Sequence, residues 1–271
     1  MTVTLRDGNV VITGGAGLLG RALGHAFARR GANIVLVDLD EATARKAAAE
    51  IGDAHGVSVR AVAADVAELG AVQDAARQAV AAFGPVTVLL NNAGRAVLKP
   101  FTELTPEDWT AVLAVQLNGV LNGIHAFLPG MVDHAAPSHI VNTSSMSGVG
   151  RADLRVLNAP YVTAKFAVVG LSETMAPALA EHGIGVSVLC PGFTHSRPES
   201  VTRFPMPSTR WYRHNILSAA EVAEETVTGV LEGRLHIFPH RAGRQEVVDR
   251  QALLLRGFDQ AEATSPPLHG T

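Results

Sequence analysis

"NVVITGGAGLLG", residues 9–20, is the stretch that decides the fold. A short β-branched run is followed at once by Gly15, Gly17 and Gly20 in the spacing G-x-G-x-x-G, and then by an alanine-rich helical pattern. Glycines permit a tight turn at such a place and let the backbone N–H groups at the start of a helix approach a pyrophosphate. The stretch therefore predicts a strand, a phosphate-binding loop and a helix.

The same alternation of short apolar runs and helical patterns continues along most of the chain. Besides residues 9–13, strands are predicted at 33–38, 57–64, 86–91, 139–144, 185–190 and 235–239. Helices are predicted at about 18–30, 40–51, 68–83, 105–133, 160–182 and 219–232. The strands are almost continuously apolar, which is typical of strands buried on both faces. We therefore predict an α/β fold with a doubly wound, parallel, seven-stranded sheet, the Rossmann fold.

No internal linker divides the chain. We therefore predict a single domain over residues 1–242, followed over residues 243–271 by a C-terminal helix and a disordered tail. The tail is expected to begin in the polar stretch "AEATSPPLHGT", residues 261–271.

The bulk composition excludes several classes of protein. With 47% hydrophobic residues, 17% charged residues and a formal net charge of −3, the 271-residue chain is typical of a globular protein with no nucleic-acid partner. The first residues form no basic, apolar leader, and no run of about eighteen apolar residues could cross a membrane. A single cysteine, Cys190, excludes an internal disulfide, so we expect a reducing cytoplasm. No metal site is expected: His236 and His240 are four residues apart, but Pro239 between them disfavours a helix.

The choice of cofactor depends on Asp38, which closes the second predicted strand. In a strand–loop–helix unit of this kind, a carboxylate at that place accepts a hydrogen bond from the ribose 2′-OH and repels a 2′-phosphate. We therefore predict NAD and not NADP as the cofactor. The alternative is a tight turn and a helix-capping aspartate with no ligand.

A candidate acid–base pair lies in "APYVTAKFAVVG", residues 159–170. Tyr161 and Lys165 are four residues apart, so on a helix their Cβ atoms lie about 5–6 Å from each other. An ammonium this close favours the phenolate and lowers the pKa of the tyrosine from about 10. Such a tyrosine can act as an acid or a base. The alternative is a half-buried tyrosine beside a lysine that reaches out to solvent.

Three further motifs follow the glycine loop: "NNAG" at 91–94, "NTSSMSG" at 142–148 and "YVTAK" at 161–165. With the four motifs in this order, the chain resembles the short-chain dehydrogenase/reductase family in its short, single-domain type. The resemblance runs from about residue 6 to residue 240. It implies a Rossmann fold, a nicotinamide cofactor and hydride transfer.

The resemblance also implies roles for the residues of the site. Tyr161 would be the proton donor or acceptor, and Lys165 would lower its pKa and hold the nicotinamide ribose. Ser145 would bind the substrate oxygen, with Ser144 as the second candidate. The residues implied for the cofactor contacts are Gly14, Gly15, Gly17, Leu18, Leu19, Gly20, Asp38, Leu39, Asp65, Val66, Asn91, Asn92, Ala93, Gly94, Tyr161, Lys165, Pro191, Gly192, Phe193 and Ser196.

Two positions depart from the family pattern. Leu18 stands where the second glycine of the usual loop falls, and the chain has Gly17 one position earlier, so a slightly altered loop is expected. Gln116 in "WTAVLAVQLNGV" stands where the family has a helix asparagine that helps to hold a water of the proton relay. A glutamine offers the same carbonyl and amide with one more methylene, so it could hold that water or displace it.

The site residues predict an NAD-dependent oxidoreductase that transfers hydride between nicotinamide and a secondary alcohol or ketone. A local excess of apolar residues in a predicted substrate lid, about 193–217, favours a bulky, apolar substrate such as an aryl, alicyclic or steroid-like alcohol. These residues are Phe193, Phe204, Met206, Trp211, Tyr212 and Leu217. Arginines of the same stretch could equally meet a substrate carboxylate.

Two other functions stay open: a catalytically silent regulator that binds NAD, suggested by Leu18 and Gln116, and an epimerase or dehydratase that retains its NAD. Besides a small-molecule substrate, the partner that we expect is a second copy of the chain. The outer positions of the helices predicted at 105–133 and 160–182 are apolar and resemble the subunit contact of the family. A homo-oligomer is therefore expected, either a tetramer or a dimer.

Overall fold

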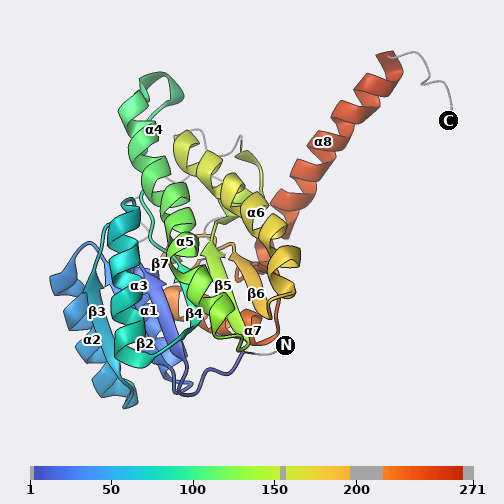
Figure 1. The fold of residues 1–271 in the computed structure, drawn as a ribbon. Coiled ribbons are helices and arrows are strands. Elements are labelled where there is room, and N and C mark those ends of the chain that lie inside the picture. Colours follow the sequence, from blue (N-terminus) through green and yellow to red (C-terminus); the bar gives the residue numbers. More distant parts are fainter. Residues whose placement is uncertain (1–2, 153–156, 196–215, 265–271) are drawn as a thin grey trace.

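The computed structural model describes residues 3–152, 157–195 and 216–264 of the chain (Figure 1). Its centre is a seven-stranded sheet in which every neighbouring pair is parallel, in the order β3-β2-β1-β4-β5-β6-β9. The predicted doubly wound sheet is therefore confirmed. The strands are β1 (Asn9–Thr13), β2 (Asn33–Asp38), β3 (Val59–Ala63), β4 (Val86–Asn91), β5 (Ser138–Thr143), β6 (Ile184–Leu189) and β9 (His236–Ile237).

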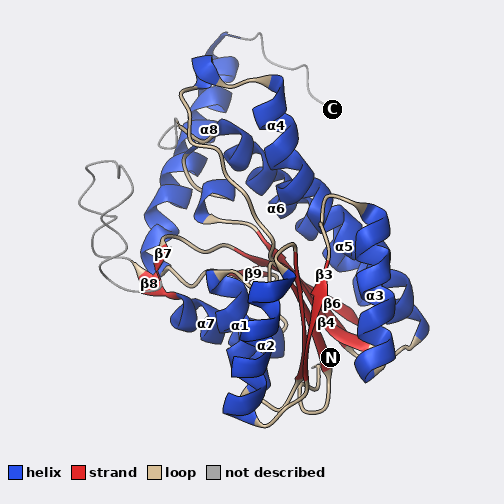
Figure 2. Ribbon diagram, turned by 90° about the vertical axis from the view of Figure 1, so that its left-hand side faces the viewer, coloured by secondary structure: helices blue, strands red, loops and turns tan. Residues whose placement is uncertain are grey.

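Helices cover both faces of the sheet (Figure 2). One layer contains α1 (Leu18–Ala28), α2 (Glu41–His55) and α7 (Ala219–Leu231). The other contains α3 (Leu69–Phe83), α5 (Gly119–Asp133) and α6 (Ala159–Ala180). Strand β1 is buried along its whole length, because Val10 and Ile12 pack into the first layer and Val11 packs into the second. The continuous apolar runs of the sequence follow from this two-sided burial.

The prediction of a single helix at 105–133 is wrong in one respect, because the helix is interrupted. α4 (Pro106–Leu113) begins at a capping box formed by Thr105 and Asp108. A π-helical turn, Ala114–Asn118, then separates α4 from α5. Apolar periodicity does not distinguish an α turn from a π turn. Turns of this kind occur often at functional sites, and this one contains Gln116.

Other elements differ from the prediction at their ends. α2 runs beyond the predicted end at residue 51 and stops at Gly56, whose φ of +66° favours glycine. Strands β3 and β9 are shorter than the predicted runs at 57–64 and 235–239. These differences leave the order of the elements unchanged.

Most of the predicted substrate lid, residues 196–215, lies outside the described residues. The two ends that are described form a small separate pair, β7 (Thr194–His195) with β8 (Leu217–Ser218). This pair brings the beginning and the end of the predicted lid together.

α8 (Arg244–Thr264) occupies the segment where a C-terminal helix was predicted, and it rises away from the body (Figure 1). Its base is packed. Glu246 is buried against Gly150, and the guanidinium of Arg250 lies 4.6 Å from the centre of the Phe166 ring.

The outer half of α8 is exposed over residues 251–262, including Leu254 and Phe258. The helix also contains residues 261–264, which were predicted to belong to a disordered tail. Alanine and glutamate in this stretch favour a helix, so polarity alone was a poor guide. Residues 265–271 lie outside the described part of the chain.

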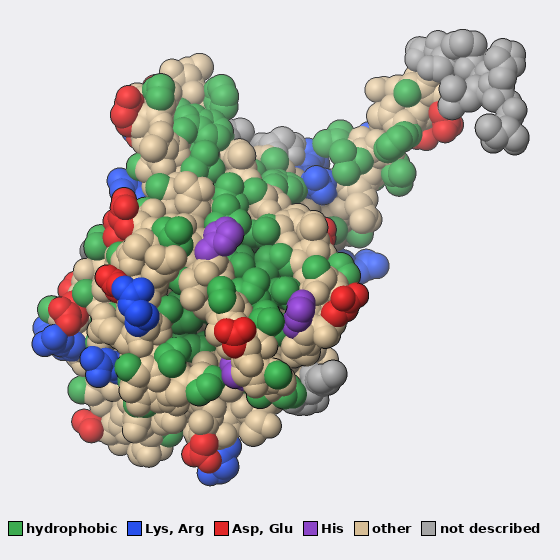
Figure 3. Space-filling view, in the orientation of Figure 1, with side chains coloured by type: hydrophobic (Ala, Val, Ile, Leu, Met, Phe, Trp, Pro, Cys, Tyr) green, Lys and Arg blue, Asp and Glu red, His purple; other side chains and the backbone are tan. Residues whose placement is uncertain are grey.

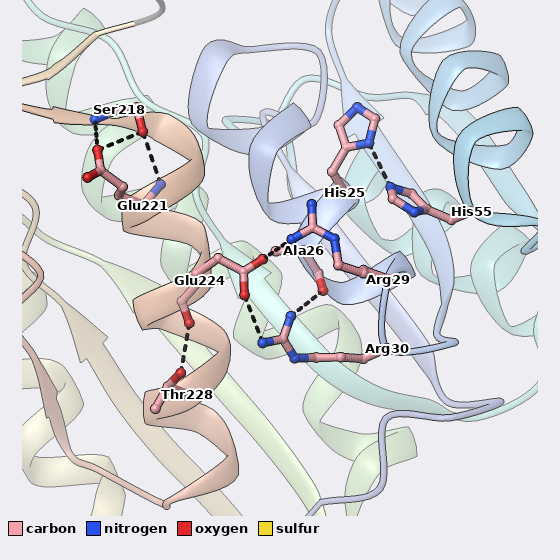
Figure 4. A network of polar contacts seen from close by, with 9 residues as sticks. All are labelled: His25, Ala26, Arg29, Arg30, His55, Ser218, Glu221, Glu224 and Thr228. Carbon is pink, nitrogen blue, oxygen red and sulfur yellow. Dashed lines mark hydrogen bonds and ion pairs between the residues drawn. The ribbon is translucent and has the colours of Figure 1, made fainter.

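A polar network fastens α7 to α1 (Figure 4). Glu224 accepts hydrogen bonds from Arg29 at 2.6 Å and from Arg30 at 2.8 Å. One turn before Arg29, His25 Nδ1 lies 3.0 Å from His55 Nε2 at the end of α2. These groups are partly exposed, so each ion pair contributes about 0–1 kcal/mol. The network mainly fixes how the three helices lie relative to one another.

Within the described residues, one helical stretch, Pro106–Asp133, is long and apolar enough to cross a membrane by length and composition. The core helix of a water-soluble protein meets the same criterion. Val112, Phe127 and Met131 of this stretch are buried inside the protein itself. The stretch is therefore weak support for a membrane span.

Candidate active site

A cavity of about 790 Å³ opens at the carboxyl ends of the strands, where the strand order turns between β1 and β4. The segments that follow β1, β2, β3, β4, β5 and β6 all contribute to its wall. The structure brings most of the predicted site residues together here. They are Gly14, Gly17, Leu18, Leu19, Gly20, Asp38, Leu39, Asp65, Val66, Asn92, Ala93, Gly94, Gln116, Ser145, Tyr161, Lys165, Pro191 and Gly192.

Other predicted cofactor residues do not line the cavity. Gly15 packs behind the loop, where an added Cβ would lie 2.7 Å from the Cβ of Leu36. Phe193 lies next to the lining residues but is not one of them, and Ser196 lies outside the described residues. A motif identifies a segment of backbone, and it does not tell which of its residues face a ligand.

The wall also contains residues that the sequence analysis did not predict. Arg95 directly follows the motif at 91–94, and Thr143 lies inside the motif at 142–148, although no role was predicted for it. Val115 is present because of the π turn, for which the sequence gives no signal. The full set is Ala64, Arg95, Ala96, Val115, Thr143 and Thr194, with Ser144 in addition as the predicted second candidate.

Close backbone contacts shape the glycine loop. Gly14 has a φ of +65°, which favours glycine, and a Cβ on Gly20 would overlap the carbonyl oxygen of Gly14. Gly17 has more room, since a Cβ there would stay 3.2 Å from the same oxygen. Leu18 is 44% exposed at the cavity. The altered loop of this chain therefore keeps glycine at the positions where the turn has no room for a side chain.

The loop leads directly into α1, which begins at Leu18 with Gly17 as its N-cap. No side chain caps the first N–H groups of the helix. The first turn thus offers unpaired N–H donors and the positive end of the helix dipole at the cavity wall. An anionic group such as a pyrophosphate suits this position.

The carboxylate of Asp38, at the end of β2, is held by two backbone N–H groups. Ala16 N donates to Oδ2 at 2.9 Å, and Asp40 N donates to Oδ1 at 3.1 Å. Each oxygen can accept one further hydrogen bond. The cations of the wall are Arg95, after β4, and Lys165, on α6. A 2′-phosphate at Asp38 would therefore meet a fixed negative charge with no cation supplied by the same strand end.

Residues of the "NNAG" motif form hydrogen bonds that support the cavity wall. Asn92 N and Ala93 N donate to Thr13 Oγ1 at 2.9 and 3.1 Å, which ties β4 to β1 beyond the end of the ladder. Asn91 is buried below the cavity wall and donates to Asn142 Oδ1 at 2.9 Å. Asn91 therefore supports the wall from behind.

Tyr161 and Lys165 lie one turn apart on α6, and both line the cavity. Lys165 Nζ lies 5.3 Å from the centre of the Tyr161 ring and donates to the carbonyl oxygen of Thr143 at 2.6 Å. The lysine is only 3% exposed. Burial lowers the pKa of Lys165 to about 7, and the nearby Cys190 acts weakly in the opposite direction. The ammonium can therefore exchange its proton near neutral pH, which suits an acid–base site.

The two neighbouring serines have different partners. Ser144 Oγ donates to the backbone carbonyl of Lys165 at 2.8 Å, so its proton is committed to holding α6. Ser145 Oγ accepts from Ser147 N at 3.1 Å and makes only a long contact, 3.4 Å, with the carbonyl of Pro191. The Ser145 hydroxyl is therefore the easier one to redirect to a substrate oxygen.

Gln116 is buried in the π turn at the cavity wall. Its Nε2 donates to the carbonyl oxygen of Arg95 at 2.7 Å, and a Cβ on Gly94 would lie 3.3 Å from the same nitrogen. Its Oε1 has no hydrogen-bond partner among the described residues. A buried amide oxygen of this kind suits a bound water.

Comparisons with known proteins identify the class to which this fold and site belong. A family model described as short chain dehydrogenase matches residues 8–203. The chain belongs to the short-chain dehydrogenase/reductase family, and the resemblance seen in the sequence is confirmed. Members of this family typically depend on NAD(P).

Relatives and a solved structure agree with this class. Over 257 residues the chain is 32% identical to the C alpha-dehydrogenase of Sphingobium sp. strain SYK-6, covering 89% of this chain and 83% of that protein. Over 186 residues it is 37% identical to the D-threitol dehydrogenase of Mycolicibacterium smegmatis, covering 68% and 70%. A short chain dehydrogenase/reductase from Burkholderia phymatum, solved in complex with NAD, has 30% identity and a TM-score of 0.82, with 99% of each chain covered.

The first curated relatives are longer than this chain. These mycobacterial proteins, named probable oxidoreductases, are 37% identical over 203 residues. The match covers 75% of this chain and about a third, 34%, of their length. The likeness therefore concerns one part of those proteins.

Proposed function

We propose that the protein transfers hydride between NAD and a secondary alcohol or ketone. The observation that carries this proposal is that Ser145, Tyr161 and Lys165 line the same cavity as the glycine loop and Asp38. Asp38 is the last residue of β2 and Ser145 follows β5, so the cavity runs across the four neighbouring strands β2, β1, β4 and β5. An extended dinucleotide suits a site of this shape.

Each residue of the catalytic end has its own role in the reaction. Bound NAD supplies the hydride acceptor. During oxidation of an alcohol, Tyr161 takes the hydroxyl proton while Ser145 donates a hydrogen bond to the substrate oxygen. The charge of Lys165 favours the tyrosinate that accepts this proton. In the reverse direction Tyr161 returns the proton to the carbonyl oxygen.

NAD is favoured over NADP because of the charge at the end of β2. Two backbone N–H groups fix the carboxylate of Asp38, and its remaining lone pairs can accept from ribose hydroxyls. Leu39, the next residue, is exposed and supplies no positive charge for a 2′-phosphate. The NAD complex of the Burkholderia phymatum protein is consistent with this preference.

A bulky, apolar secondary alcohol is the substrate class that we favour. The support is the run of apolar and aromatic residues in the predicted lid, of which Phe193 and Leu217 are described in the structure. The name of one dehydrogenase relative points to another class, because threitol is a small polyol. A direct comparison of aryl carbinols with threitol is therefore the decisive substrate experiment.

The function is tested by following NADH formation on a panel of aryl, alicyclic and polyol secondary alcohols. Tyr161→Phe is the matched control, because it keeps the ring and loses only the acid–base hydroxyl. We expect turnover by the parent on at least one aryl or alicyclic alcohol. The variant should lose nearly all turnover while its NAD affinity stays within about threefold.

The other outcomes identify the alternatives. NAD binding without turnover anywhere on the panel would favour a catalytically silent regulator. Product formation without NADH accumulation would favour an epimerase or dehydratase that retains its NAD. A preference for threitol over every aryl alcohol would reject the apolar substrate class and leave the dehydrogenase activity standing.

We further propose that the protein works as a cytoplasmic homo-oligomer, a tetramer or a dimer. Figure 3 shows apolar side chains gathered on the face that carries α5 and α6. Leu128, Leu171 and Met175 on this face are only partly buried. A monomeric mass in sedimentation at micromolar concentration would contradict the assembly.

A further inference from the structure

His240 contacts Gly192 of the cavity wall, at the place where two paired strands separate. The last backbone hydrogen bond between the β6 and β9 chains runs from Cys190 N to Ile237 O at 2.9 Å. The next donor toward β6 would be residue 239 of the other chain segment, and Pro239 has no N–H. Backbone bonding of the kind seen in the ladder therefore stops where the cavity wall begins.

The imidazole of His240 supplies the missing support. Its Nδ1 accepts from Gly192 N at 2.9 Å, and its Nε2 lies 2.9 Å from the carbonyl oxygen of Phe193. Because Nδ1 accepts a backbone N–H, the ring proton is on Nε2, which donates to Phe193. Both nitrogens of a ring that is only 4% exposed are thus engaged by one segment of main chain, Pro191–Phe193.

The surroundings favour the neutral ring that this arrangement requires. Burial lowers the pKa of His240, although the carbonyl of Phe193 and the carboxylate of Glu221 act in the opposite direction. Glu221 is itself held in a capping box with Ser218 at the start of α7 (Figure 4). The absence of a side chain at Gly192 also matters, because a Cβ there would lie 2.9 Å from Cγ of His240.

The segment held in this way forms part of the active site. Pro191 and Gly192 line the cavity. The carbonyl oxygen of Pro191 accepts from Met146 N at 2.9 Å and contacts Ser145 Oγ at 3.4 Å. A displacement of the segment would therefore change the cavity wall and also the position of the catalytic serine.

We propose that His240 is a positioning residue, which holds the Pro191–Phe193 segment against bound NAD and, through Pro191, keeps Ser145 in place. The inference rests on the proposed function for the identity of the ligand. The hold on the segment can be measured without any ligand.

The experiment compares His240→Leu, which keeps the bulk and loses both hydrogen bonds, with His240→Asn, whose Oδ1 can take the place of Nδ1. His236→Leu is the matched control, because His236 lies on β9, bonds to Glu173 and does not line the cavity. Three quantities are measured: hydrogen exchange of the Gly192 amide in the NAD-free protein, the Kd of NAD by calorimetry, and thermal unfolding.

In His240→Leu we expect the Gly192 amide to exchange about tenfold faster or more, and NAD to bind about tenfold more weakly. His240→Asn should restore most of the Gly192 protection and keep the Kd within about threefold of the parent. The control should change neither quantity.

Two results would overturn the proposal. One is a leucine variant that loses thermal stability but keeps its Gly192 protection and NAD affinity. The other is an asparagine variant as impaired as the leucine variant. If the leucine variant does not fold, the asparagine variant alone tests the proposal, against the parent. A parent protein that binds no NAD would reject the proposed function, whereas the exchange measurement would still decide the role of His240.

Discussion

The two ends of the cavity are built from different parts of the chain. At the cofactor end the wall contains the glycine loop, in which Gly14 and Gly20 leave no room for a side chain. At the catalytic end the wall contains the buried Ser145 and Lys165 and the partly buried Tyr161, and their side chains contact neighbouring groups. The cofactor end should therefore be sensitive to added volume, and the catalytic end to changes of charge and hydrogen bonding.

The largest effect is expected from Gly20→Ala at the cofactor end. The added Cβ would overlap the carbonyl oxygen of Gly14, which is backbone and cannot turn aside like a flexible side chain. We expect NAD affinity to fall more than about a hundredfold, or about 2.7 kcal/mol, together with a lower Tm. Calorimetry and thermal unfolding measure the two quantities.

The matched control is Gly70→Ala in the first turn of α3, where an added Cβ meets no atom within 4 Å. This change should leave NAD affinity unaltered and raise stability by up to about 1 kcal/mol. NAD affinity of the Gly20 variant within twofold of the parent would contradict the steric argument.

The next effect concerns charge at the catalytic end. Burial lowers the pKa of Lys165 to about 7 from the model-compound value of 10.5, so the folded state holds the charged lysine at a cost. The unfolded chain keeps the proton between pH 7 and pH 10.5 while the folded protein releases it, so this unfavourable contribution is largest below pH 7 and fades toward pH 10.5.

Lys165→Met should therefore stabilise the NAD-free protein relative to the parent at pH 6, and the gain should shrink by on the order of 3 kcal/mol by pH 10. Turnover should be lost. Denaturant unfolding at the two pH values measures the difference. Lys46→Met, at an exposed position of α2, is the control and should show no such pH dependence. A gain that is equal at both pH values would reject the argument.

A smaller effect is expected from the charge of Asp38. Asp38→Asn removes the charge and keeps an acceptor for Ala16 N, so the loop should stay in place. The preference for NAD over NADP should then decrease by about 1–3 kcal/mol, and a basic residue at position 39 should decrease it further. The ratio of kcat/KM for the two cofactors measures the preference. A parent that already prefers NADP would show that Asp38 has another role.

The same comparison shows why the sequence revealed the cofactor end more completely. Its glycines stand where steric crowding excludes any other residue, and that requirement is visible as spacing. At the catalytic end the spacing of Tyr161 and Lys165 was also visible. The hydrogen-bond partners of Lys165 and Gln116 were not visible, because Thr143 and Arg95 contribute main-chain carbonyls, which every residue carries.

Two further features required the structure. The π turn around Gln116 has no signature in the apolar pattern, so a continuous helix was predicted. In the sequence, the spacing of His240 and His236 bears only on a possible metal site. Its contacts depend on where the pairing of β6 and β9 ends, beside Pro239, which is a property of the assembled sheet.

Gln116 lies in the cavity wall beside Gly94 and is expected to have the smallest effect of these positions on turnover. Its Nε2 is bonded to the Arg95 carbonyl, whereas its buried Oε1 has no partner among the described residues. A water held by this oxygen would satisfy it and could pass protons between Lys165 and solvent.

If Gln116 holds such a water, Gln116→Ala should lower turnover about tenfold, or about 1.4 kcal/mol, and Gln116→Asn should stay within a few fold of the parent. Asn118→Ala is the control, because Asn118 is an exposed residue of the same π turn. The measurement needs a substrate for which chemistry is rate-limiting, over about pH 6 to 10. Equal turnover of Gln116→Ala and the parent over that range would exclude Gln116 from the relay. The proton would then have to leave by a path that depends on Ser145, Tyr161 and Lys165 alone.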